Sequence, residues 1–196
     1  MTIIGIAGDS GSGKTTVSEN LFTNSFVVVY HLDHIFDSIK DLLLGILISK
    51  VTRSSGEVIK SLDHNKQASS FFSSGFISAL KWLYARYYLG LLINKAQKDN
   101  VDYFIIEGFA LEKCVKLDDL DYRIFVRAPQ ELRNNRVLNR NVEGELNCAN
   151  LQCEYTEEGY DAIIDNDQTF DDLLAQIRFV EEDIKKRYMP RTLNNN

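Results

Sequence analysis

The sequence predicts an α/β domain built on a parallel sheet of five strands, with helices on both faces of the sheet. Short apolar runs alternate along the chain with longer segments of helical periodicity, and such an alternation is typical of a parallel sheet covered on both sides. The chain has 196 residues, 44% of them hydrophobic and 26% charged. This length and composition fit one globular domain, residues 1–196, and exclude a disordered chain or a fibre.

The strands are expected where apolar and β-branched residues gather between turn signals. They cover residues 2–7, 25–30, 101–107, 122–126 and 161–164. Helices are expected at residues 14–22, 33–51, 76–97, 129–141 and 169–187. Thr169 is the predicted N-cap of the last helix. Residues 52–75 are polar and rich in serine and glycine, so we expect a connection or an insertion on the substrate side.

Charge and cysteine content narrow the range of partners. The 22 Lys and Arg residues face 28 Asp and Glu residues, which disfavours binding along the backbone of a nucleic acid. The apolar stretch 42–48 is too short to span a membrane. Three cysteines (Cys114, Cys148 and Cys153) and a start without a basic leader predict reduced thiols, no metal site on cysteine and a cytoplasmic location. A homodimer is left open.

The strongest motif is GDSGSGKT, which runs from Gly8 to Thr15 between a predicted strand and a predicted helix. It fits the P-loop pattern G-x-x-x-x-G-K-[ST]. Its glycines let backbone N–H groups turn towards a phosphate, and the helix adds its positive N-terminal end. Lys14 supplies a charge at the β- and γ-phosphates, and the hydroxyl of Thr15 is a ligand for Mg²⁺. The predicted nucleotide-binding residues are Gly8, Asp9, Ser10, Gly11, Ser12, Gly13, Lys14, Thr15 and Thr16.

This motif makes the predicted class the three-layer αβα fold of P-loop NTPases, with ATP and Mg²⁺ as cofactors. Its surroundings, IIGIAGDSGSGKTT, resemble the opening of the uridine kinase-like branch of P-loop kinases, which includes nicotinamide riboside and pantothenate kinases. The stretches HLDHIF (31–36) and FIIEGF (104–109) are similar to that branch's "DxFF/DSFY" and "hhhEG" segments. The resemblance implies that Asp33 accepts the proton of the attacking hydroxyl and that Phe36 contacts the substrate. The alternative for Asp33 is the N-cap of the following helix.

Glu107 ends an otherwise apolar strand. A carboxylate at that position is predicted to bind Mg²⁺ through water or to hydrogen-bond the substrate. The alternative is an acid that is simply solvated.

Three arginines, Arg133, Arg136 and Arg140, are spaced i, i+3 and i+7 and share one helical face. Kinases of this class resemble one another in an arginine-bearing helical lid, here at about residues 129–150. The resemblance implies that Arg133 and Arg140 bind the nucleotide and that Arg136 neutralises charge as the phosphoryl group moves. Arg127 is a weaker member of this set. The alternative is a solvated basic face.

The stretch DAIIDND (161–167) resembles the last strand of dephospho-coenzyme A kinases, which makes Asn166 a candidate contact of the base. The aromatic residues of the long middle helix either stack on an acceptor ring or belong to the core. They are Trp82, Tyr84, Tyr87 and Tyr88. The three histidines lack the spacing of metal ligands. They are His31, His34 and His64.

These motifs together predict an ATP- and Mg²⁺-dependent kinase for a hydroxyl of a small nucleoside-like or coenzyme-precursor molecule, with residues 40–98 on the acceptor side. One alternative is a dephospho-coenzyme A kinase-like enzyme. Another is a nucleotide-switched NTPase that binds a protein partner through residues 35–51 and 76–93, although the guanine motif N-K-x-D is missing from the sequence. A membrane-peripheral role for the same helices is the third.

Overall fold

We analysed a computed structural model of the chain, which describes residues 1–32, 75–109, 111–139 and 158–188, with side chains in the second range from Trp82 onwards. The helix predicted at 33–51 and the connection that follows it lie outside the described residues. The same holds for several predicted site residues, histidines and cysteines: Asp33, His34, Phe36, His64, Arg140, Cys148 and Cys153.

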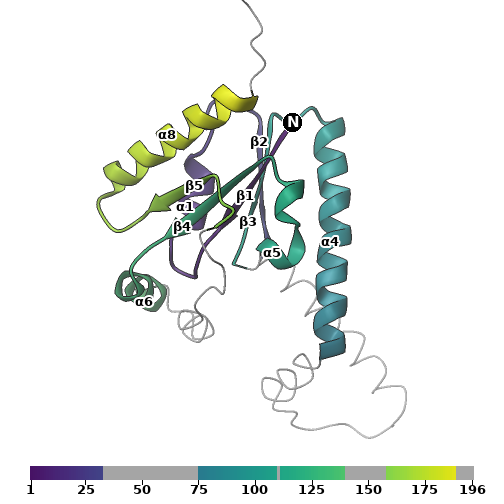
Figure 1. The fold of residues 1–196 in the computed structure, drawn as a ribbon, viewed down its shortest axis with the longest axis horizontal. Coiled ribbons are helices and arrows are strands. Elements are labelled where there is room, and N and C mark those ends of the chain that lie inside the picture. Colours follow the sequence, from purple (N-terminus) through teal and green to yellow (C-terminus); the bar gives the residue numbers. More distant parts are fainter. Residues whose placement is uncertain (33–74, 110, 140–157, 189–196) are drawn as a thin grey trace, which may run out of the picture.

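Five parallel strands form one sheet in the order β2-β3-β1-β4-β5 (Figure 1). The strands are β1 (Thr2–Ala7), β2 (Val27–His31), β3 (Tyr103–Glu107), β4 (Tyr122–Arg127) and β5 (Ala162–Asp165). The central strand β1 pairs with β3 on one side and β4 on the other. Since all five strands are parallel, their carboxyl ends meet at one edge, where sheets of this type present ligand-binding residues.

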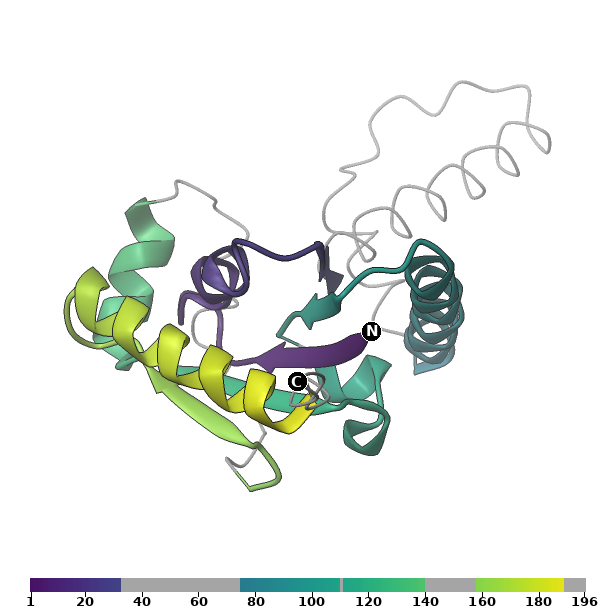
Figure 2. The same cartoon turned by 90° about the horizontal axis from the view of Figure 1, so that it is seen from above.

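The two faces of the sheet are covered by different helices, as the alternation of side chains along a strand requires. On one face, Ile6 and Ile105 pack with α1 (Lys14–Asn20) and α8 (Phe170–Tyr188). On the other face, Ile106 packs with α4 (Gly75–Lys98) and α5 (Leu111–Cys114). Figures 1 and 2 show α4 beside β2 and β3, and α8 beside β4 and β5. The predicted three-layer αβα arrangement is confirmed.

The predicted elements within the described ranges are present, with ends that shift by one or two residues. The most useful shift is at β2, which extends to His31 and so carries this residue to the carboxyl edge of the sheet. Two short elements were not predicted, α5 and a 3-10 turn at Leu117–Asp119. Both are too short to show a helical period in the sequence.

The predicted cap of α8 is confirmed. The backbone N–H of Asp172 donates to Thr169 Oγ1 at 3.2 Å, and the N–H of Thr169 donates to Asp172 Oδ2 at 3.2 Å. This reciprocal pair is a capping box with aspartate in place of glutamate. The helix then buries one apolar stripe of helical spacing, formed by Leu173, Ile177, Val180 and Ile184.

The core face of α4 consists mainly of small and aliphatic side chains such as Ala85, Leu89 and Ala96, and Trp82 is partly buried against the same cluster. Tyr87 is 66% exposed, so its assignment to the core is wrong. Tyr84 and Tyr88 stack on each other with ring centroids 6.0 Å apart. Within the described ranges, α4 and the other helices include none with the length and hydropathy of a membrane span.

Candidate active site

The P-loop joins the carboxyl end of β1 to the N-terminus of α1, as the motif predicts. Gly8 and Gly13 have φ angles of +149° and +102°, a region that residues with a Cβ atom rarely occupy. A Cβ atom at Gly13 would lie 2.1 Å from Asn166 Nδ2, and one at Gly8 would lie 2.1 Å from the carbonyl oxygen of Val126. These glycines therefore also let the loop pack closely on the ends of β4 and β5.

Lys14, the first residue of α1, is buried and folds back over the loop. Its Nζ donates to the carbonyl oxygen of Asp9 at 3.0 Å. The ammonium group and the N-terminus of α1 thus place positive charge at the same point, which is the arrangement that binds anions such as phosphate.

Thr15 and Glu107 come together at this edge although 92 residues separate them in the sequence. Thr15 Oγ1 lies 3.2 Å from Glu107 Oε1 and 3.3 Å from Oε2. Glu107 is the last residue of β3, and its side chain is 5% exposed. A hydroxyl and a carboxylate are hard oxygen donors of the kind that Mg²⁺ prefers.

The hydroxyl of Thr15 and the carboxylate of Glu107 suit a Mg²⁺ ion that is shared with a bound phosphate. They are too few to form a metal site made of protein ligands alone. Within the described ranges, no three His, Cys, Asp or Glu side chains gather as a metal site. Mg²⁺ usually keeps several waters and takes one or two carboxylates together with substrate phosphates. Thr15 and Glu107 are therefore the residues here that could hold it, and their predicted binding of Mg²⁺ stays a prediction.

His31 belongs to this site, although sequence reasoning set it aside. It is the register partner of Glu107 across β2 and β3, and its Nδ1 lies 2.5 Å from Glu107 Oε1. The signal that could have found it is positional: both residues end neighbouring strands. Because paired residues of adjacent strands project to the same face, two polar residues at such ends meet.

The arginines of α6 (Gln130–Asn139) contact the P-loop itself. Arg133 is 4% exposed, and its guanidinium forms an ion pair with Asp9 at 3.2 Å and donates from Nε to the carbonyl of Ala128 at 3.2 Å. Arg136 donates from NH1 to the carbonyl of Gly11 at 3.3 Å. The shared face of these two residues is therefore turned towards the loop. Their predicted contacts with the nucleotide stay predictions.

Asn166 follows β5 and links three elements. Its Nδ2 donates to the carbonyl of Ser12 at 2.7 Å, in a buried contact between residues 154 positions apart. Its side-chain and backbone oxygens accept hydrogen bonds from Arg136 NH2 at 3.2 and 3.1 Å. The sequence predicted that Asn166 contacts the base of the nucleotide. In the structure its side chain lies between the P-loop and α6 and bonds to both. The predicted base contact remains untested.

Arg127 is engaged at a different place. Its guanidinium pairs in a bidentate manner with Asp165 across β4 and β5, and the two residues are also register partners. Such a contact fixes the end of the sheet beside the P-loop. The predicted role of Arg127 beside the other arginines stays a prediction.

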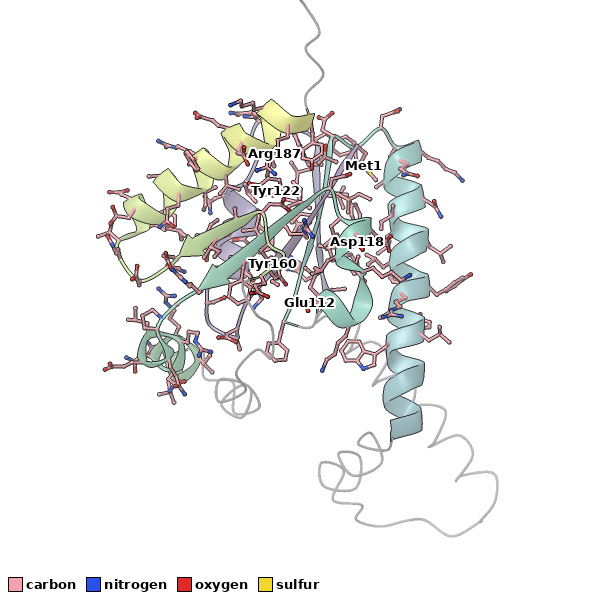
Figure 3. All side chains as sticks on the ribbon, in the orientation of Figure 1. Met1, Glu112, Asp118, Tyr122, Tyr160 and Arg187 are labelled. Atoms are coloured by element: carbon pink, nitrogen blue, oxygen red, sulfur yellow. The ribbon has the colours of Figure 1, made fainter. Side chains whose placement is uncertain are left out.

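A second electrostatic cluster lies at the amino end of the sheet, away from the P-loop. The guanidinium of Arg187, near the end of α8, lies 5.0 Å from the ring centroid of Tyr122, and Figure 3 shows both residues at the same end of the molecule as Met1. The hydroxyl of Tyr122 donates to Asp183 at 2.7 Å, and Arg187 NH2 pairs with Asp183 at 2.8 Å. The hydrogen bond from Tyr122 and the charge of Arg187 lower the pKa of Asp183. This cluster holds α8 on the sheet and takes no part in the candidate site.

The five parallel strands, the loop after β1 and the two helical layers form a three-layer αβα fold with a P-loop, and solved structures share this fold. Among solved structures, the protein TT1252 from Thermus thermophilus has a TM-score of 0.67 at 23% identity, covering 93% of this chain and 97% of that chain. A dephospho-CoA kinase from Campylobacter jejuni has a TM-score of 0.59 at 18% identity, with coverages of 94% and 98%. A sugar kinase from Janibacter sp. has a TM-score of 0.56 at 16% identity, with coverages of 94% and 95%. No protein-family model matches the chain, and no curated protein is significantly similar to it in sequence.

Proposed function

We propose that the chain is an ATP- and Mg²⁺-dependent kinase that transfers the γ-phosphoryl group to a hydroxyl of a small nucleoside-like or coenzyme-precursor molecule, as uridine kinase-like enzymes do. The observation that carries the proposal is the meeting of Lys14, Thr15 and Glu107 at the carboxyl ends of β1 and β3. The likeness in fold to a sugar kinase and a dephospho-CoA kinase supports a kinase in general.

In this proposal the P-loop residues bind the triphosphate through their N–H groups and the N-terminus of α1. Lys14 exchanges the carbonyl of Asp9 for phosphate oxygens. The hydroxyl of Thr15 and the carboxylate of Glu107 would hold Mg²⁺. When bound, Mg²⁺ neutralises charge on the β- and γ-phosphates, and phosphoryl transfer depends mainly on such positioning and charge stabilisation.

In this proposal the acceptor hydroxyl gives its proton to Asp33, which comes two positions after the last residue of β2 in the sequence. Phe36 lies against the acceptor in this proposal. Arg136 supplies positive charge during transfer, from a position at the carbonyl of Gly11. Arg133 and Arg140 complete the arginine-bearing lid.

The test is the release of ADP from ATP in the presence of nucleosides, nicotinamide riboside, pantothenate or dephospho-coenzyme A. One of these acceptors should raise turnover above the rate with ATP alone. Lys14→Ala should abolish nucleotide affinity or turnover. Asp33→Asn should keep ATP binding and lose most of the transfer, and equal turnover in that variant would remove Asp33 from the mechanism.

A dephospho-coenzyme A kinase-like enzyme is the second candidate. It is favoured by the stretch DAIIDND at residues 161–167 and by the fold likeness to an enzyme of that name. The same panel separates the two candidates, because dephospho-coenzyme A is much larger than a nucleoside and would be the acceptor that supports turnover.

A nucleotide-switched NTPase with a protein partner is the third candidate. One observation favours it: α4 exposes apolar side chains, with Leu83 at 65% and Leu91 at 47% exposure. Such a protein would bind its partner in a nucleotide-dependent manner and would show no dependence on a small acceptor.

A further inference from the structure

His31 and Glu107 are the last residues of two neighbouring strands, and β2 is the edge strand of the sheet. His31 Nδ1 lies 2.5 Å from Glu107 Oε1. Because the oxygens of an ionised carboxylate only accept hydrogen bonds, Nδ1 is the donor in this contact. The imidazole is 27% exposed and the carboxylate 5%. His31 therefore contacts the buried carboxylate of Glu107 from the side that is more open to solvent.

Thr15 alone does not fix the orientation of Glu107. Its hydroxyl lies almost equally far from the two carboxylate oxygens, 3.2 Å from Oε1 and 3.3 Å from Oε2. A hydroxyl has one hydrogen to donate, so these two distances are compatible with either oxygen. The contact of His31 Nδ1 with Oε1 holds the carboxylate from a second direction and limits its rotation, while the oxygens keep lone pairs to accept from Thr15.

The direction of these hydrogen bonds matters for a metal. When the hydroxyl of Thr15 gives its hydrogen to Glu107, its lone pairs stay available for a cation. Glutamate also has several rotatable bonds, and fixing them costs conformational entropy. A donor built into β2 holds the carboxylate before the nucleotide arrives.

We propose that His31 is a positioning residue for Mg²⁺-nucleotide binding. It orients the carboxylate of Glu107, and this carboxylate accepts the hydrogen of the Thr15 hydroxyl, so that the lone pairs of the hydroxyl face the metal. This inference rests on the proposed function only for the presence of a Mg²⁺-nucleotide site. It does not depend on which acceptor is phosphorylated.

Groups that orient metal ligands typically change metal affinity by about 10- to 100-fold when they are removed. The replacements of His31 can therefore be graded by where they place a donor. Asparagine places its amide nitrogen about where Nδ1 lies in histidine, glutamine places it one bond further out, and alanine has no donor.

The experiment is calorimetric titration of the full chain with the β,γ-imido analogue of ATP, with and without MgCl₂. The quantity compared is the ratio of the two dissociation constants, which measures how much Mg²⁺ improves nucleotide binding. In His31→Ala this ratio should fall by about 10-fold or more, while the dissociation constant without Mg²⁺ stays as in the wild type. His31→Asn should restore the ratio, and His31→Gln should not.

Val29→Ala is the matched control. Val29 lies two residues earlier in β2, on the same face of the sheet, and its register partner is Ile105. This truncation also perturbs β2 but removes no donor from Glu107, so it should keep the wild-type ratio.

The proposal is overturned by an unchanged ratio in His31→Ala, by a wild type that binds the analogue equally well without Mg²⁺, or by an equal loss of affinity with and without Mg²⁺. If His31→Ala does not fold, the comparison of His31→Asn with His31→Gln decides: a higher ratio for Asn supports the proposal, and equal ratios overturn it. An acceptor panel without turnover would instead refute the kinase assignment and leave this binding result standing.

Discussion

Asn166 offers the sharpest test of how the P-loop is held. Its carboxamide bridges the carbonyl of Ser12 and the guanidinium of Arg136, at 2.7 and 3.2 Å. Asn166→Ala removes both contacts and leaves a buried carbonyl without this donor. We expect a less stable protein whose P-loop is also less well ordered for nucleotide binding.

The magnitude follows from the two bonds. A hydrogen bond between neutral groups contributes about 0.5–1.5 kcal/mol, and one to a charged group about 1.5–3 kcal/mol. The free energy of unfolding should therefore fall by about 2–4.5 kcal/mol. Fixing the backbone of one loop residue costs about 1–2 kcal/mol. Loss of order at even one residue therefore weakens nucleotide binding by about 10-fold, since 1.4 kcal/mol corresponds to that factor.

Gln176→Ala provides the matched control. Gln176 also makes two hydrogen bonds through its carboxamide, with the N–H and the carbonyl of Asp165 at 2.9 and 2.8 Å. It thus holds the same end of β5 without touching the P-loop. Urea denaturation and ADP titration of both variants should show a loss of stability in both, and a loss of affinity in Asn166→Ala alone.

Two outcomes would refute this reasoning. If Asn166→Ala bound ADP with wild-type affinity, the carboxamide would not order the loop. If Gln176→Ala lost as much affinity, the effect would come from β5 in general and not from the contact with Ser12.

Further predictions concern the P-loop and the pH dependence of stability. Gly13→Ala should destabilise the chain, because φ is +102° and its Cβ would lie 2.1 Å from Asn166 Nδ2; in a double-mutant cycle with Asn166→Ala the cost should be smaller, and strictly additive costs would contradict the contact. The pKa of Asp183 is lowered in the folded protein, first by the hydrogen bond from Tyr122. The ionised carboxylate therefore stabilises the fold at pH values above its pKa in the unfolded chain, and this stabilisation is lost as the pH falls through its pKa in the folded protein. Asp183→Asn should therefore flatten the loss of stability in urea titrations below about pH 4, by no more than about 1 kcal/mol because the cluster is partly exposed. Burial raises the pKa of Tyr30 from 10.0 to about 12. The neutral phenol therefore stabilises the fold below pH 10, and this stabilisation is lost as the pH rises towards 12. Tyr30→Phe should remove that loss of stability.

The fold could be predicted because its signals are local. Each strand is a short apolar run, and the alternation of strands with helices dictates a parallel sheet. The residues at 111–119 were missed because α5 and the 3-10 turn that follows it are each less than two helical turns long. Their helical form is set by packing on the sheet, where Leu111 is fully buried.

The candidate site was predicted where one segment carries its own chemistry, and missed where chemistry depends on register. The P-loop motif is complete within eight consecutive residues, Gly8–Thr15, so the sequence alone reveals it. His31 gains its partner only through the pairing of β2 with β3. The helical spacing of Arg133 and Arg136 correctly placed them on one face, but their contacts with Asp9 and Gly11 depend on how α6 docks. The spacing of residues within a helix does not predict how that helix docks on the rest of the chain.

We propose that the edge formed by Lys14, Thr15 and Glu107 supports transfer of a phosphoryl group from ATP to a small hydroxyl compound. The most direct measurement is ³¹P nuclear magnetic resonance of ATP, Mg²⁺ and each candidate acceptor with the full chain. We expect a new phosphomonoester signal with one acceptor, equal in amount to the ADP formed, and no such signal with Lys14→Ala. ADP accompanied only by inorganic phosphate, whatever acceptor is present, would contradict it.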